Sequence, residues 1–261
     1  MRAFAFALAI FSCIGAAPVV AAPDESKTAT AHPADWLDRL SHAEKLARVT
    51  QPEELVIPSA LQQMDRSMVS AMRGNEQFQE IEAALPGFSE RYYAAARPEL
   101  EKIFHAGMPE MWTAVAEAFA SEMTIPEIDS ATRFFSSPLG AKLVRLQTQN
   151  LDSKSLMEIG LKDGLADKGP SKEASESLKS AAVEATISTV ADLSPSERSA
   201  VVAFGVSPAG RAVRRAGPGV QKAILDWSTR DDPEGDQRMG EIAIGVAAQM
   251  KAEQKKAQAP K

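Results

Sequence analysis

Some side chains in this sequence have the types that bind metals. Met64, Met68 and Met72 are spaced four residues apart, so on a helix they would form a single stripe of thioethers. Thioethers can bind copper(I), but flexible methionines also fill irregular gaps in helical cores. We predict that the stripe is core. The histidines, which show no metal-ligand spacing with one another or with nearby carboxylates, are predicted to be structural or at the surface. They are His32, His42 and His105.

Ser207 is the most suggestive nucleophile, because it lies between glycines in the segment Gly205–Gly210. The spacing departs from the Gly-x-Ser-x-Gly elbow of hydrolases, and no strand precedes it. Ser207 is therefore predicted to cap a helix. The acidic pairs would need a shared, buried cleft for acid–base catalysis, and we expect them in solvated helix ends or loops. Examples are Glu53 with Glu54, Glu80 with Glu82, and Asp231 with Asp232. We predict no catalytic, cofactor-binding or metal-binding residue.

The charge balance of the chain limits its partners. The sequence has 29 Lys and Arg against 35 Asp and Glu, a net charge of −6. Nucleic-acid surfaces need clustered positive charge, so no nucleic-acid partner is expected. Arg211, Arg214 and Arg215 form a local basic cluster that could meet an anionic lipid or partner. A solvated helix face is the favoured interpretation.

The first residues have the pattern of a secretory signal peptide. Met1-Arg2 is followed by a short apolar run and then by small residues up to Ala22. We predict a signal over residues 1–21, cleaved after Ala21 or Ala22, and a periplasmic location in a Gram-negative-type envelope. An uncleaved anchor or a lipid attached at Cys13 is the minor alternative. Cys13 is the only cysteine, so the mature protein would have no disulfide or cysteine-based site, no membrane span and a charge of about −7.

The rest of the chain has helical periodicity broken by Pro and Gly. Aromatic residues make up only 6% of the sequence, which disfavours strands. We predict an all-α, multi-helix bundle in which prolines fall between helices, except that one helix from about Leu100 to Phe119 continues past Pro109. Residues 22–34 should be a disordered spacer, 35–163 and 170–250 two helical regions, and 251–261 a disordered basic tail. The stretch 162–172, rich in Gly and charge, should be a hinge between the two regions.

One short motif occurs twice, at residues 124–145 and 194–215, with a constant offset of 70. Each copy begins with a hydroxyl residue and a glutamate three positions later, which is a capping box. A phenylalanine and a Ser-Pro-x-Gly step follow. We interpret the repeat as an internal duplication. The shared motif residues are Thr124, Glu127, Phe134, Ser137, Pro138 and Gly140 in the first copy, and Ser194, Glu197, Phe204, Ser207, Pro208 and Gly210 in the second.

The Ser-Pro-x-Gly step predicts a tight corner between two helices. Proline disfavours helical geometry in the residue before it and suits the first position of a new helix, which the serine caps. Glycine in the first turn would let the preceding helix approach closely. After the corner, the first copy should pack Leu139, Leu143 and Leu146 inward. The second copy has Ala209, Val213 and Ala216 instead, which predicts a thinner core there.

At these residues the chain resembles the exported bacterial family named domain of unknown function two-zero-five-nine. That family has a hydroxyl cap, Glu-Leu, Phe-Tyr and Ser-Pro-x-Gly-x-Lys. The first copy matches with Glu127-Ile128, Phe134-Phe135 and Lys142, whereas the second copy departs at Arg198, Gly205 and Ala212. The second copy could therefore be only a structural echo. The resemblance implies a helical envelope protein and assigns no activity.

Two functions remain open from the sequence. The favoured one is a non-enzymatic periplasmic module that binds a protein or peptide, because repeated helical units build binding surfaces. The alternative is an envelope enzyme whose carboxylate- or serine-based site is assembled from distant helices. No cofactor is expected under the favoured interpretation. The identity of the partner and the oligomeric state are open.

Overall fold

The computed structural model describes residues 33–150 and 188–258, and every regular element in these ranges is a helix. The fold class is all-α, as predicted. The helices are α1 (Trp36–Thr50), α2 (Glu53–Gly74), α3 (Glu76–Ala84), α4 (Phe88–Glu122), α5 (Ile125–Phe135), α6 (Pro138–Asn150), α9 (Pro195–Val206), α10 (Pro208–Thr229) and α11 (Pro233–Gln258). No described helix has both the length and the apolar content needed to cross a membrane.

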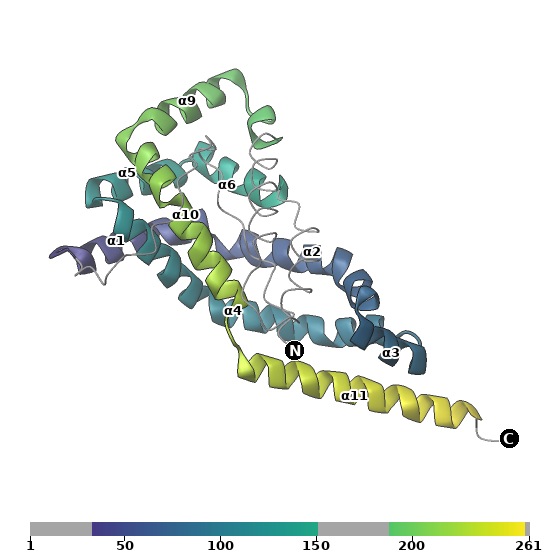
Figure 1. The fold of residues 1–261 in the computed structure, drawn as a ribbon. Coiled ribbons are helices and arrows are strands. Elements are labelled where there is room, and N and C mark those ends of the chain that lie inside the picture. The colour runs from purple at the N-terminus through teal and green to yellow at the C-terminus, as the bar shows by residue number, and fades with distance from the viewer. Residues whose placement is uncertain (1–32, 151–187, 259–261) are drawn as a thin grey trace.

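Helix α4 is the centre of the bundle (Figure 1). It buries residues along its whole length, from Phe88 and Tyr92 near its start to Phe119 and Ala120 near its end. Helices α1, α2, α10 and α11 all pack against it. Because a helix that is surrounded in this way must be apolar on several faces, α4 has no single hydrophobic stripe. Of the helices that flank the two corners, α10 packs on α4, whereas α5 packs on α1.

Ion pairs along α4 fix the direction of the last two helices. Arg230 at the end of α10 pairs with Glu110 at 3.1 Å, Arg238 pairs with Glu99 at 2.8 Å, and Arg91 pairs with Glu253 at 2.7 Å. From residue 230 to residue 253, each later position therefore pairs with a residue nearer the start of α4. Helix α11 thus runs antiparallel to α4, beneath it in Figure 1.

Four prolines lie inside helices of the described residues, whereas the sequence predicted this only for Pro109. Pro58 is inside α2, which begins at Glu53 rather than near Ser59, Pro98 and Pro109 are inside α4, and Pro218 is inside α10. An interior proline removes one backbone hydrogen bond and costs about 3 kcal/mol. Around Pro98 the helix buries Tyr92, Tyr93, Ala96, Leu100 and Phe104 against its neighbours, and this burial offsets the cost.

The methionine stripe lies in the core, as predicted. Met64, Met68 and Met72 on α2 are each no more than 2% exposed. They belong to one hydrophobic cluster that extends from Ala43 on α1 to Met250 on α11. The helices before residue 150 and those after residue 188 therefore share a single core.

Helix α11 continues to Gln258, so residues 251–258 are helical and exposed. The expectation of a disordered tail from residue 251 was wrong for this stretch, where good helix formers such as Lys, Ala, Glu and Gln extend a helix already anchored at Met250. The predicted signal peptide, His32 and the predicted hinge at 162–172 lie outside the described residues.

Candidate functional site

The first corner has the geometry expected from its sequence. Pro138 is the first residue of α6, directly after Ser137. The Ser137 hydroxyl accepts a hydrogen bond from the Gly140 N–H at 3.2 Å and donates one to the Phe134 carbonyl at 2.6 Å. One hydroxyl therefore provides a hydrogen-bond partner for a backbone N–H at the start of α6 and for a backbone carbonyl at the end of α5. Upstream, the Glu127 carboxylate accepts from both the N–H and the hydroxyl of Thr124 at 2.9 Å.

The second corner repeats this local geometry. The Ser207 hydroxyl accepts from the Gly210 N–H at 3.1 Å and donates to the Phe204 carbonyl at 2.6 Å, and Pro208 begins α10. The predicted capping role of Ser207 is confirmed. At the start of α9, Ser194 and Glu197 form the reciprocal capping box, with bonds of 3.3 and 2.8 Å. A common origin of the two segments stays a prediction.

Both corners depend on the absence of a glycine side chain. A Cβ on Gly140 would lie 2.1 Å from the Phe134 carbonyl oxygen, and a Cβ on Gly210 would lie 2.0 Å from that of Phe204. Real Cβ atoms do not approach a backbone oxygen so closely. The glycines therefore let the two helices of each corner touch through their backbones, as predicted.

The structure brings the two corners together. The rings of Phe134 and Phe204 stack in parallel, with centroids 3.8 Å apart and planes at 3°. Phe135 lies edge-on to both rings, at 5.2 and 5.6 Å. Equivalent residues of the two motifs thus meet each other, as equivalent residues do at a two-fold interface between subunits.

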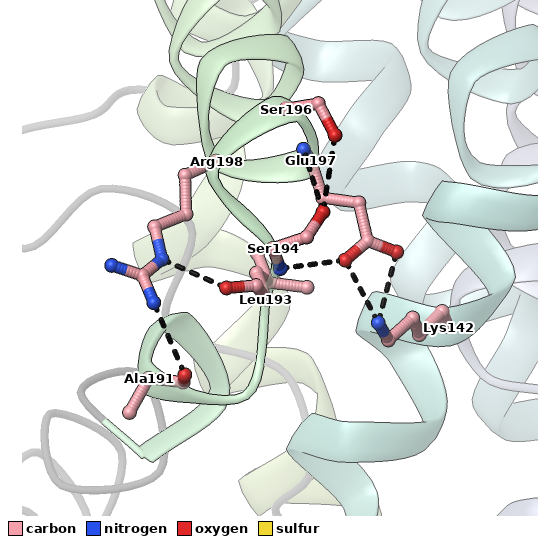
Figure 2. A network of polar contacts seen from close by, with 7 residues as sticks. All are labelled: Lys142, Ala191, Leu193, Ser194, Ser196, Glu197 and Arg198. Carbon is pink, nitrogen blue, oxygen red and sulfur yellow. Dashed lines mark hydrogen bonds and ion pairs between the residues drawn. The ribbon is translucent and has the colours of Figure 1, made fainter.

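Two charge pairs cross between the corners. Lys142, after the first corner, contacts both carboxylate oxygens of Glu197 at 2.9 Å (Figure 2). Arg215, after the second corner, lies 3.6 Å from Glu127. Each capping-box glutamate is therefore paired with a cation from the other motif. The Lys142 hydrogen bond, followed by the bonds from Ser194, lowers the pKa of Glu197 to about 2.

The packing after the two corners differs from the prediction of a thinner core in the second. Ala209, Val213 and Ala216 are all buried, at 2, 7 and 0% exposure. In the first copy only Leu143 is buried, whereas Leu139 and Leu146 are half-buried. The small residues of α10 allow it to lie close against α4 and α5, so the second copy contributes the more completely buried face.

A pocket of about 430 Å³ lies beside the first corner, where that corner faces the junction of α1 and α2. Its deep wall is apolar, and includes Trp112 at 8% exposure and Phe135 and Val144 at 1% each. The Trp112 indole N–H donates to the Gln51 carbonyl at 2.8 Å, which fixes the ring. The ring that stabilises the pair of corners, Phe135, therefore also forms part of the pocket.

The polar lining of the pocket carries charges of both signs. The Arg48 guanidinium lies over the Trp112 ring, 4.0 Å from its centroid. Glu53 and Glu54, in the first turn of α2, and Ser136, between α5 and α6, complete the polar side. Glu53 is paired with His105 of α4. Arg48, Glu54 and Ser136 are exposed, so charged groups surround the entrance to an apolar interior.

The described histidines each contact one carboxylate. His42 Nδ1 lies 2.6 Å from Asp129 Oδ1, joining α1 to α5, and His105 pairs with Glu53. Within residues 33–150 and 188–258, no serine hydroxyl hydrogen-bonds to either ring, and no three His, Cys, Asp or Glu side chains are grouped to hold a metal. These contacts are interhelical pairs.

The basic cluster of α10 is partly used within the fold. Arg211 and Arg214 donate to the carbonyl oxygens of Val206 and Gly205, and Arg215 donates to that of Glu122. Cations at the end of a helix satisfy its free carbonyls and favour its dipole. The three arginines are exposed, and their hydrogen bonds stabilise the ends of α9 and α4.

Sequence reasoning missed the pocket, because its lining comes from α1, α2, α4 and the first corner. The acidic pair Glu53 and Glu54 was noticed as a helix end, which it is. Arg48 and Trp112 are 64 positions apart, and no local pattern links them.

Residues 109–153 match the model of a family described as an uncharacterized protein conserved in bacteria (DUF2059). The match covers the second half of α4, the first corner and the start of the following segment, and it confirms the resemblance drawn from the first motif. The second corner lies outside the matched residues. Comparisons with curated proteins and with solved structures gave no match.

Proposed function

We propose that this chain is an exported, periplasmic helical protein that binds a protein or peptide partner and catalyses no reaction. The observation that carries the binding role is the pocket between the first corner and the α1–α2 junction. Its volume, about 430 Å³, falls in the range of sites for small ligands and single anchor side chains. An apolar interior with a few charged groups at the entrance is the usual composition of such sites.

The way the pocket is built also supports binding. Its walls belong to α1, α2 and α4 and to the corner, all of which are held by the common core. A pocket on such a rigid frame loses little conformational entropy when a ligand enters. The second corner holds Phe135 in place through Phe204, so it supports the binding surface without lining the pocket.

Binding is tested by photo-crosslinking in cells. A photoreactive amino acid is placed at Ser136, which is exposed in the pocket, and in a matched variant at Ser121, which is exposed on α4 outside it. We expect a reproducible adduct from position 136 only, identified by mass spectrometry. Equal adducts from both positions, or none from position 136, would contradict the proposed site.

Export is tested separately by fractionation of cells that express the full chain. The signal-like residues 1–21 predict release of the protein by osmotic shock, with a mature N-terminus at Ala22 or Pro23. A protein that stays with the cytoplasmic fraction and retains Met1 would contradict export.

A further inference from the structure

We infer that the pocket binds a short peptide with free termini and an apolar side chain, whose carboxylate pairs with Arg48 and whose ammonium pairs with Glu54. This inference rests on the proposed binding function and specifies the class of ligand. It follows from three properties of the lining: a cation and an anion without an ion-pair partner among the described residues, and an apolar surface.

Arg48 is the cation. One face of its guanidinium lies on Trp112, 4.0 Å from the ring centroid, which holds the group in a fixed plane. Among the described residues it has no carboxylate partner. Its N–H edges are therefore free, and a planar guanidinium is suited to bind a carboxylate through two parallel hydrogen bonds.

Glu54 is the anion. Its neighbour Glu53 is engaged by His105, whereas Glu54 is exposed and has no ion pair or hydrogen bond within the described part of the chain. A carboxylate in this position offers a partner to an ammonium group. A ligand with only one charge would leave either Arg48 or Glu54 without a partner.

The apolar part of the lining selects the body of the ligand. Val49 and Leu55 are half-buried and line the pocket together with the more deeply buried Trp112, Phe135 and Val144. A leucine or aromatic side chain buried there gains about 1.5–3 kcal/mol from removal of its apolar surface from water. A peptide of two or three residues combines such a side chain with both charges.

The test is calorimetric titration of the mature protein with three probes that share one apolar body: leucyl-leucine, N-acetyl-leucyl-leucine and leucyl-leucinamide. We expect leucyl-leucine to bind most tightly. Each blocked probe should bind about three- to fivefold more weakly, the size of one solvent-accessible ion pair.

Two variants assign the termini. Arg48→Gln should weaken binding of the probes with a free carboxylate and leave leucyl-leucinamide unchanged. Glu54→Gln should weaken binding of the probes with a free ammonium and leave the N-acetyl probe unchanged. Lys45→Gln and Glu44→Gln, exposed on α1 outside the pocket, are the matched controls and should have no effect. Thermal melting of each variant confirms that it is folded.

The inference is overturned if the three probes bind equally, if none binds, or if Arg48→Gln and Glu54→Gln weaken every probe to the same extent. Failure here can be told apart from failure of the binding proposal. An adduct at position 136 without binding of leucyl-leucine would contradict only the inference that the ligand is a short peptide with free termini. If position 136 gives no adduct and leucyl-leucine does not bind, both the binding proposal and the peptide inference are contradicted.

Discussion

At the scale of single residues, the two corners depend most on Gly140 and Gly210. Their α-carbons face a backbone carbonyl of the preceding helix rather than a flexible side chain. Backbone cannot yield as a side-chain tip can, so any added atom must push the two helices apart. The serines beside them then lose hydrogen bonds at 3.1–3.2 Å that start the next helix.

Gly140→Ala and Gly210→Ala should each destabilise the protein by about 2–3 kcal/mol, the cost of forced overpacking. The control is Gly205→Ala, because a Cβ at Gly205 meets nothing within 4 Å. There we expect no loss, or a gain of up to about 1 kcal/mol from higher helix propensity. Urea denaturation measures all three. Equal stability of Gly140→Ala and Gly205→Ala would refute the close approach at the first corner.

At the scale of elements, the two helix–corner–helix units recognise each other through one aromatic stack and two crossed ion pairs. The stack joins α5 to α9, and the ion pairs join α6 to α9 and α10 to α5. Helix α9 has Phe204 as its buried residue. The stack is therefore its main attachment to the rest of the bundle.

Phe134→Ala and Phe204→Ala should each lower the free energy of unfolding by about 3 kcal/mol. Together they should cost less than the sum, by about 0.5–1.5 kcal/mol, because the stack can be lost only once. Phe204→Ala combined with Phe88→Ala, which stacks on Tyr92 instead, is the additive control. Additivity in both double variants would argue against a direct Phe134–Phe204 contact.

The Lys142–Glu197 pair makes the contact between the corners sensitive to acid. The pKa of Glu197 is about 2 in the folded protein, against an ordinary value of 4.5. A lowered folded pKa stabilises the protein fully above the ordinary value, and this contribution is lost as the pH falls from about 4.5 towards about 2. Glu197→Gln should therefore differ most from the wild type near neutral pH and least near pH 2.

Denaturation midpoints measured between pH 2 and pH 7 test this expectation. Glu44→Gln, on an exposed part of α1, is the control and should parallel the wild type throughout. If the difference between the wild type and Glu197→Gln stays constant over this range, the ion pair contributes nothing to stability.

The local part of this arrangement could be predicted from sequence, because capping boxes and Ser-Pro-x-Gly steps are encoded by adjacent residues. The helical fold and the core position of Met64, Met68 and Met72 followed from periodicity in the same way. Which side chains of the two corners contact each other could not be predicted. Phe204 could have packed on any apolar surface, and nothing within 20 residues of Lys142 indicates Glu197. Pro98 was misjudged because tertiary burial outweighs the loss of one hydrogen bond.

At the scale of the whole molecule, α4 and the single core join the two regions of the chain. Residues on α10 such as Ile224, at 1% exposure, belong to the same cluster as Leu46 on α1. Gly107 on α4 lies so close to Trp227 on α10 that a Cβ there would be 2.7 Å from the ring. The regions before residue 150 and after residue 188 should therefore unfold together.

Ile224→Ala should lower stability by about 2–4 kcal/mol and move the whole transition to lower denaturant. Far-ultraviolet circular dichroism and tryptophan fluorescence, which reports Trp36, Trp112 and Trp227, should give coincident curves. Ile81→Ala, at a surface position 38% exposed, is the control with a small effect. Two separate transitions would show that the regions are independent domains.

The slender attachment of α9 has a consequence for how the molecule opens. Val202 and Val206 on this helix are 65 and 63% exposed, while Phe204 alone on it is buried. Local opening is cheapest where few apolar contacts are broken. The amide protons of α9 should exchange with deuterium well before those of α4, and Phe134→Ala should speed exchange in α9 more than in α11. The protein would then detach this helix reversibly while the rest of the bundle stays folded.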